Sequence, residues 1–350
     1  MTIHSRPWLE QIQPYRPGRR ATSADGSMAS NESPIGTSPQ VATALAAAAT
    51  DIHRYPDPMA DSLRRELAHL HHVEPDQILI GNGSDELILL LATAFLAQGG
   101  HAVAADPAYR VDEISTQVVN ARMTKVALKD WVHDLDTMAE VKADIAYIVN
   151  PHNPTGTTVK LADIKHFAAT CRADLVVVDE AYIDFTDDPD TTTAMTLVNT
   201  GNVAVIRTFS KSHGLAGLRI GYLVASPSVI ATLRKIRAPF SVGTLAQAGA
   251  IAALSDSAYR SRIRGHTIQY RERVTRLLER AGYTVVPSQA NFVLVVADED
   301  AFTARLASYG ITVRPGQALG IAGTVRVSVP SEKGFELLQA ALCISPMEQD

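Results

Sequence analysis

Five short apolar runs constrain the fold of this chain more than any other feature. They span residues 78–80, 102–105, 145–149, 175–178 and 203–206, and segments with helical character separate several of them. Continuous β-branched runs interleaved with helices are typical of a parallel sheet that is covered on both faces. The sequence therefore predicts an α/β architecture.

Polar side chains follow the apolar runs, at the ends where the strands would stop. They are Asp106, Asn150, Asp179, and Thr208 with Ser210. In open α/β sheets, ligands bind at the carboxyl ends of the strands. We therefore expect a small-molecule site along this edge.

The pattern divides the chain into three parts, and 350 residues are enough for two domains. Residues 1–30 are polar and rich in turn formers, so we interpret them as an arm that packs on other segments. Residues 31–236 hold the predicted sheet. Residues 237–350 predict a smaller α+β domain, with helices at 243–255, 257–282 and 332–343 and short strands near 284–287, 291–296 and 325–329.

Composition excludes several classes of protein. A hydrophobic fraction of 46% supports a large core, and a net charge of −5 without a basic stripe argues against nucleic-acid or membrane partners. The longest apolar run, residues 87–97, is too short to cross a bilayer. Two cysteines, Cys171 and Cys343, lack metal-ligand spacing, so we expect no metal. With no signal-peptide pattern at the start, we expect a cytoplasmic protein.

The segment from Thr208 to Tyr222 carries the strongest chemical signal. Lys211 lies between small hydroxyl residues in an otherwise uncharged stretch directly after a predicted buried strand. A desolvated amine has a lowered pKa and can form a Schiff base, while Thr208, Ser210 and Arg219 could hold an anionic group beside it. The alternative is an ordinary loop lysine beside N-cap serines.

Three further segments favour a site for a charged cofactor. Asp179 ends an apolar strand, which suits a partner for a protonated ring nitrogen, a magnesium ligand or a helix N-cap. Asn153 lies in an Asn-Pro turn that either presents its amide to a ligand or is an ordinary loop. The turn at 81–84 opens a helix whose free N–H groups would bind phosphate. Glu86 rules out the dinucleotide fingerprint there.

In this order and spacing, the four segments resemble those of fold-type I pyridoxal-phosphate aminotransferases. Within that group the chain is most similar to histidinol-phosphate aminotransferases and the related aromatic aminotransferases. The similarity extends from Tyr15 to Val329. The resemblance implies an aspartate-aminotransferase-like fold, with a mixed, mostly parallel sheet in the large domain. The matching motifs are Asn31-Glu-Ser-Pro, Arg54-Tyr-Pro-Asp57, Gly81-Asn-Gly-Ser-Asp-Glu-Leu87, Thr208-Phe-Ser-Lys211 and Pro287-Ser-Gln-Ala-Asn-Phe292.

The resemblance also implies roles for individual residues around pyridoxal 5'-phosphate. Lys211 would form the Schiff base and move the proton, and Asp179 would pair with the ring nitrogen. Tyr182 and Asn153 would bind the ring oxygen, and Tyr109 would stack on the ring. The cofactor phosphate would be bound by Ser84, Asp85 (through its backbone), Thr208, Ser210 and Arg219.

Substrate binding and assembly follow from the same resemblance. Arg326, with Arg314 nearby, would bind the anionic group of the substrate, and Tyr15 and Asn31 would line the substrate entrance. Tyr55 would reach the cofactor phosphate of a neighbouring subunit, so the resemblance implies a homodimer with shared active sites. The implied reaction is amino-group transfer between L-histidinol phosphate and 2-oxoglutarate, in histidine biosynthesis. Alternatives are an aromatic aminotransferase acting on phenylalanine or tyrosine, and a decarboxylase or oxidase on the same fold.

Three departures from the family pattern concern the substrate rather than the cofactor. Arg110-Val-Asp112 follows Tyr109 where a small residue and then an aromatic are usual. His213 replaces an aromatic, and Pro330-Ser-Glu-Lys-Gly334 replaces a familiar glycine motif. Asp112 is expected either to face a cationic or imidazole substrate or to pair with Arg110 on the surface.

Overall fold

A seven-stranded sheet forms the centre of the computed structural model, which describes residues 4–15, 17–96 and 99–342. Its strand order is β1-β7-β6-β5-β4-β2-β3. The pairs from β3 to β6 are parallel, whereas β7 is antiparallel to both β6 and β1. The predicted mixed, mostly parallel sheet is confirmed. The strands are β1 (Ile78–Gly81), β2 (His101–Asp106), β3 (Arg122–Ala127), β4 (Ala143–Val149), β5 (Ala173–Asp179), β6 (Val203–Thr208) and β7 (Gly221–Val224).

Both faces of this sheet are buried, which explains why its strands have continuous apolar sequences. In β5, Val176 and Val178 belong to one core, while Leu175 and Val177 belong to the other. Successive side chains of a strand point to opposite faces, so a strand between two cores needs apolar residues at every position. The helices of this part are α1 (Pro39–Ala48), α2 (Asp61–His71), α3 (Gly83–Phe95), α4 (Arg110–Val118), α5 (Leu135–Ala139), α6 (Leu161–Thr170), α7 (Pro189–Thr192), α8 (Pro227–Arg234) and α9 (Thr244–Ser255).

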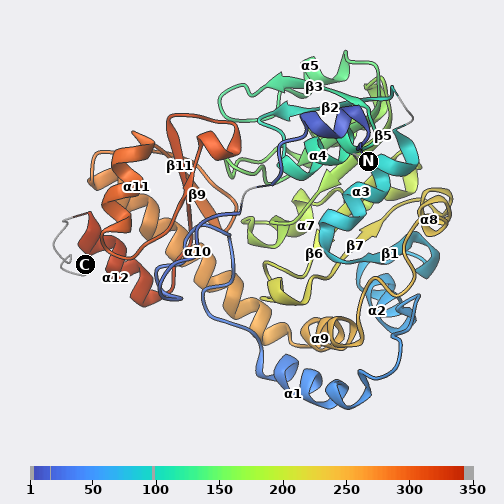
Figure 1. The fold of residues 1–350 in the computed structure, drawn as a ribbon, viewed down its shortest axis with the longest axis horizontal. Helices are drawn as coiled ribbons and strands as arrows, with labels where there is room; N and C mark the ends of the chain where they lie inside the picture. Colours follow the sequence, from blue (N-terminus) through green and yellow to red (C-terminus); the bar gives the residue numbers. More distant parts are fainter. Residues whose placement is uncertain (1–3, 16, 97–98, 343–350) are drawn as a thin grey trace.

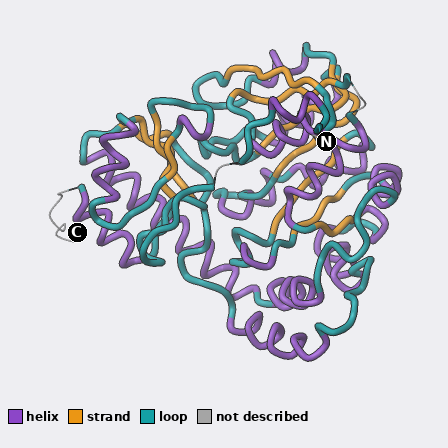
Figure 2. The backbone as a smooth tube through the Cα atoms, in the orientation of Figure 1, coloured by secondary structure: helices purple, strands orange, loops and turns teal. Residues whose placement is uncertain are grey.

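A four-stranded antiparallel sheet, in the order β10-β11-β9-β8, lies apart from the large one (Figures 1 and 2). The long helix α10 (Ser257–Arg280) runs toward it from α9. The predicted helix end at residue 343 lies outside the described residues. The remaining elements are β8 (Thr284–Val286), β9 (Phe292–Val296), α11 (Glu299–Ala307), β10 (Arg314–Pro315), β11 (Thr324–Ser328) and α12 (Glu332–Ala341).

The end of the N-terminal arm joins the small sheet. Met28 is fully buried in the core of that sheet, and its backbone bonds to Thr312 and Ser328. Just beyond Met28, Ser30 and Asn31 bond to Lys211 and Tyr182, so this segment joins the small sheet to the carboxyl edge of the large one. The expected domain boundaries after residues 30 and 236 stay predictions.

Three strands lacked a sequence signal. β3 is the edge strand of the large sheet and carries Arg122, Thr124 and Lys125, so no apolar run marks it. Two of the four residues of β7 belong to the segment 208–222, which was interpreted for its chemistry, and β10 has two residues, too few for a pattern. Among the described residues, no helix is both long enough and apolar enough to span a membrane.

Candidate active site

A cavity of about 220 Å³ lies at the carboxyl edge of the large sheet. Strand β5 ends there at Asp179 and β6 ends at Thr208, as expected for parallel strands. The cavity brings together residues from six separate segments of the chain. Ten predicted site residues line it: Ser84, Asp85, Tyr109, Asn153, Asp179, Tyr182, Thr208, Ser210, Lys211 and Arg219.

Lys211 presents its amine to this cavity. The Nζ atom donates a hydrogen bond to the carbonyl oxygen of Ser30 at 3.2 Å and lies 5.8 Å from the ring centre of Tyr182. Burial and the nearby charge of Arg326 lower the lysine pKa from 10.5 to about 8. A large fraction of the amine is therefore neutral near pH 8, the state in which it acts as a nucleophile or base.

Asp179 and Tyr182 line the cavity from the end of β5 and the turn that follows it. The carboxylate of Asp179 accepts a hydrogen bond from the backbone N–H of Ala181 at 2.9 Å. Burial raises the pKa of Asp179 from 3.8 to about 7, so a cationic partner would be needed to keep it charged. The hydroxyl of Tyr182 accepts a hydrogen bond from Asn31 Nδ2 at 3.1 Å.

One end of the cavity is built to hold an anion. Helix α3 begins at Gly83, so the backbone N–H groups of its first turn lack partners within the helix. Arg219 reaches this end, where its Nη2 pairs with Asp85 Oδ2 at 3.0 Å. The hydroxyls of Thr208 and Ser210 bond to each other at 2.9 Å beside it. A cation, hydroxyls and free N–H groups together suit a phosphate group.

A second cavity of about 330 Å³ shares Tyr109 and Asn153 with the first. Arg326 and Arg314 line it from neighbouring strands of the small sheet, where β10 and β11 pair them directly, and Tyr15 lines it from the arm. Arg326 is buried, and its Nε atom has no hydrogen-bond partner. A buried guanidinium with an unsatisfied donor favours an anionic ligand.

Apart from Tyr15, the residues of both cavities lie within the region matched by one family model. The model for aminotransferases of class I and II matches residues 27–342. The chain belongs to the class I and II aminotransferases. This confirms the resemblance inferred from the motifs and shows that the protein is an aminotransferase.

Individual class I and II aminotransferases match nearly the whole chain. The histidinol-phosphate aminotransferase of Halalkalibacterium halodurans is 36% identical over 96% of this chain and 95% of its own length. The aromatic amino acid aminotransferase of Thermobifida fusca is 39% identical, over 93% and 92%. The Sinorhizobium meliloti histidinol-phosphate aminotransferase, solved with pyridoxal-5'-phosphate, is 28% identical with a TM-score of 0.89 over 98% and 97%. The expected fold type is thereby confirmed.

Two predicted site residues lie outside both cavities of this aminotransferase. Asn31 is buried behind the wall, where Ser328 Oγ donates to its Oδ1 at 2.7 Å. It therefore contacts the site through Tyr182 rather than lining the substrate entrance. Tyr55 is 82% exposed and stacks on Phe240, with ring centres 4.6 Å apart.

Both expectations for Asp112 are wrong. Its side chain is 1% exposed and neither carboxylate oxygen has a hydrogen-bond partner, so it faces neither substrate nor solvent. Arg110 instead pairs with Glu113, one helical turn further along α4. Asp112, the third residue of α4, points toward the interior, whereas Arg110 and Glu113, three positions apart, lie on the same face of the helix. His213, the second of the three departures, is buried and packs against Phe209.

Several residues of the two cavities were not predicted. Ser30 and Glu32 line the first cavity and flank Asn31, the first residue of a recognised motif. Arg110, Glu113 and Lys125 line the second, together with the turn at 317–320. Of these residues, only Arg110 could have been inferred to line the cavity, because it directly follows Tyr109, whereas Lys125 comes from the unpredicted strand β3.

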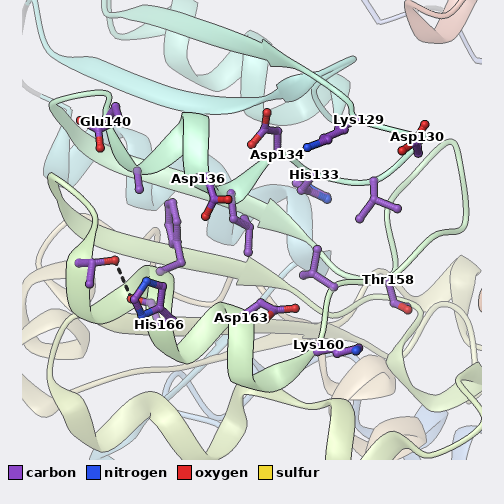
Figure 3. A pocket seen from close by; sticks show the side chains of 16 residues that line it. Lys129, Asp130, His133, Asp134, Asp136, Glu140, Thr158, Lys160, Asp163 and His166 are labelled. Carbon is purple, nitrogen blue, oxygen red and sulfur yellow. Dashed lines mark hydrogen bonds between the residues drawn. The ribbon is translucent and has the colours of Figure 1, made fainter.

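A larger cavity, of about 730 Å³, lies elsewhere, between α5 and α6 (Figure 3). Asp134, Asp136, Glu140 and Asp163 surround an apolar floor that includes Phe167. No predicted site residue lines it. The cavity of about 220 Å³ is the candidate active site. Lys211 and Asp179, whose pKa values are shifted, converge there with the anion site at Arg219.

Proposed function

We propose that this aminotransferase uses pyridoxal 5'-phosphate to transfer an amino group between L-histidinol phosphate and 2-oxoglutarate. The observation that carries the proposal is the convergence of Lys211, Asp179 and the anion site of Arg219 on one cavity. The names of the Halalkalibacterium and Sinorhizobium relatives support the substrate, and the latter structure supports the cofactor.

The residues present fit pyridoxal phosphate. A Cβ atom on Gly83 would lie 2.5 Å from Arg219 Nη2, so glycine leaves the space that the arginine needs at the phosphate end. Ser84, Thr208 and Ser210 supply further donors there, and Asp85 supplies a backbone N–H at the start of α3. A buried carboxylate and a buried amine at the other end suit a cationic ring and an aldehyde.

When bound, pyridoxal phosphate supplies an electron sink that weakens the bonds at the α-carbon of the substrate. Asp179 would hold the ring nitrogen in its protonated state, since the raised pKa of the carboxylate shows that it needs a cationic partner. Tyr109 would cover one face of the ring, and Tyr182 and Asn153 would bind its oxygen. Lys211 would carry the proton at Nζ, where its pKa of about 8 suits transfer in both directions.

The second cavity would hold the anionic group of the substrate. Arg326 and Arg314 line it next to Asn153 and Tyr109, at the boundary with the first cavity. A phosphate monoester or a carboxylate would satisfy the unpaired Nε of Arg326. Tyr15 lies over Arg314, with 5.9 Å between ring centre and guanidinium carbon, and would close the outer side.

The alternative is an aromatic amino acid aminotransferase, which the 39% identity to the Thermobifida enzyme favours. Both substrates carry an anion and a planar ring, so the same arginines serve either. Discrimination would depend on whether the anion is a phosphate or a carboxylate.

We also propose a homodimer in which Tyr55 completes the neighbouring active site. The Tyr55 and Phe240 rings are exposed, and Arg237 and Gln247 fasten the Tyr55 loop through hydrogen bonds to the carbonyls of Pro58 and Asp57. An ordered, exposed aromatic pair is typical of a protein interface. Light scattering should give twice the chain mass, and Phe240→Asp should lower it and weaken cofactor binding. A monomeric wild-type protein would contradict the proposal.

Absorption spectra test the reaction. Purified protein with pyridoxal phosphate should show the visible band of lysine-bound cofactor, and histidinol phosphate should remove it. Loss of the band with phenylalanine alone, in a fresh sample, would favour the alternative. Lys211→Ala should lack the band while equilibrium dialysis still detects bound cofactor. If the wild-type protein shows no band, the cofactor assignment is wrong.

A further inference from the structure

The N-terminal arm packs on helix α4, beside the second cavity. The short 3₁₀ turn at Pro7–Gln11 contacts α4, and in Figure 1 it lies over this part of the large sheet. The indole Nε1 of Trp8 donates a hydrogen bond to the carbonyl oxygen of Val118 at 3.1 Å. This bond fastens the beginning of the arm to the end of α4.

Arg110 fastens the arm at the other end of α4. Its Nη2 donates to the backbone carbonyl of Gln13 at 2.8 Å, and its Nη1 pairs with Glu113 Oε2 at 2.5 Å. Lys125 pairs with the second oxygen, Glu113 Oε1, at 3.0 Å. Both oxygens of the carboxylate are thus engaged, and Glu113 fixes the direction of the guanidinium.

Charge and burial support this orientation. The Glu113 side chain is 19% exposed and that of Arg110 is 31% exposed, so the pair is partly shielded from water. Burial alone would raise the pKa of Glu113, but Lys125 and Arg110 outweigh it and lower that pKa. Glu113 therefore stays charged at neutral pH and keeps Arg110 in place.

The fastened segment crosses the side of the second cavity. Arg110 and Glu113 line that cavity from α4 and Lys125 lines it from β3, while Arg314 lines it from the small sheet. Tyr15, two residues after Gln13, lines it as well and lies over Arg314. The arm thus extends from α4 to Arg314, which lies on the opposite side of the second cavity.

We propose that Arg110 is a positioning residue that holds residues 7–15 across the substrate cavity, with Glu113 and Lys125 orienting it. By holding the arm, Arg110 keeps Tyr15 beside Arg314. Tyr15 then narrows the second cavity around the substrate group that lies next to the bound anion. The inference rests on the proposed function for the identity of the substrate. The position of the arm can be measured without catalysis.

Trp8 reports the position of the arm. The chain has two tryptophans, so Trp131→Phe leaves Trp8 as the single tryptophan whose fluorescence is followed in the cofactor-loaded protein. Arg110→Ala in this background should raise the acrylamide quenching constant of Trp8 about twofold, because one charged hydrogen bond to the arm is lost. Glu113→Gln should have a smaller effect in the same direction.

Two control variants separate the loss of the Arg110 contact with the arm from the effect of any substitution in this region. Gln13→Ala should behave as the parent protein, because Gln13 accepts through its backbone carbonyl. Arg122→Ala should also be silent, since this arginine lies at the far end of β3 and contacts His101. Arg110→Ala should raise the KM for histidinol phosphate about fivefold with little change in kcat, the loss expected for one such contact.

Each result has a defined meaning. Unchanged quenching and unchanged KM in Arg110→Ala would overturn the proposal. A raised KM without increased quenching would also overturn it, because Arg110 would then act on the substrate directly. Increased quenching with unchanged KM would show that the arm does not bound the substrate cavity, which overturns it too. If Arg110→Ala increases the quenching but the parent protein turns over neither histidinol phosphate nor phenylalanine, the role of Arg110 in holding the arm is supported and the proposed function is refuted.

Discussion

Arg326 Nη1 donates a hydrogen bond to Asn153 Oδ1 at 2.6 Å, although 173 positions separate the two residues. The same guanidinium donates from Nη2 to the carbonyl oxygen of Ala29 at 2.8 Å. One side chain of β11 therefore contacts the turn after β4 and the arm at once. Nε is the guanidinium nitrogen left without a partner.

Replacing Arg326 tests its role in substrate binding. Arg326→Lys keeps the positive charge but loses the planar set of donors, so the lysine cannot serve Asn153, Ala29 and an anion together. The KM for histidinol phosphate should rise roughly tenfold or more, since charged hydrogen bonds contribute about 1.5–3 kcal/mol. Steady-state kinetics measure this, with Arg122→Lys as the exposed control. Loss of the cofactor with an unchanged KM would contradict the assignment.

Asp179 should reduce the stability of the cofactor-free protein as the pH rises. Its folded pKa of about 7 exceeds the ordinary value of 3.8, so between these values the folded state binds more protons than the unfolded state. Stability is therefore lost as pH rises through this window. Asp179→Asn should remove the loss and be more stable than wild type at pH 8, by on the order of 2–4 kcal/mol.

Urea unfolding of the cofactor-free proteins at pH 5.5 and pH 8 measures this difference. The advantage of Asp179→Asn should be larger at pH 8 than at pH 5.5. The variant should also fail to turn over, because asparagine cannot balance a protonated ring nitrogen. An equal difference at both pH values would show that Asp179 does not titrate in this window.

Asp112 should also reduce the stability of the protein as the pH rises. Burial, and then the charges of Asp179 and Asp85, raise its pKa well above 3.8. The folded state keeps Asp112 protonated, whereas the unfolded state does not. The free energy of unfolding therefore falls as the pH rises through the folded pKa of Asp112. Asp112→Asn should match wild type at acidic pH and exceed it at alkaline pH. Thermal unfolding across pH checks this, and Asp174→Asn, at an exposed position of β5, should show no such trend.

Gly83 should be essential to cofactor affinity. Its φ of +76° disfavours other residues, and an added Cβ would lie 2.5 Å from Arg219 Nη2. Gly83→Ala should displace Arg219 and weaken pyridoxal phosphate binding roughly tenfold, measured by spectroscopic titration. Gly265→Ala is the matched control, because a Cβ there meets nothing within 4 Å and alanine favours its helix. Unchanged affinity in Gly83→Ala would refute the phosphate site.

The central strands could be predicted because each is buried on both faces. Leu175 to Val178 has no polar position, since two cores need apolar residues alternately. β3 escaped prediction because Arg122 and Lys125 occupy an edge strand with one exposed side. Asp112 was misplaced because its neighbours in sequence do not reveal which side of α4 faces the sheet.

The sequence by itself determined the local chemistry of this aminotransferase. A lysine after a buried strand, a carboxylate at the end of another and a glycine turn opening a helix are each encoded within a few residues. Only the tertiary structure decided which groups meet. Lys211 bonds to Ser30 across 181 positions, and Arg110 holds an arm residue 97 positions away. Such contacts depend on how strands and helices pack, because packing sets distances that no local pattern contains.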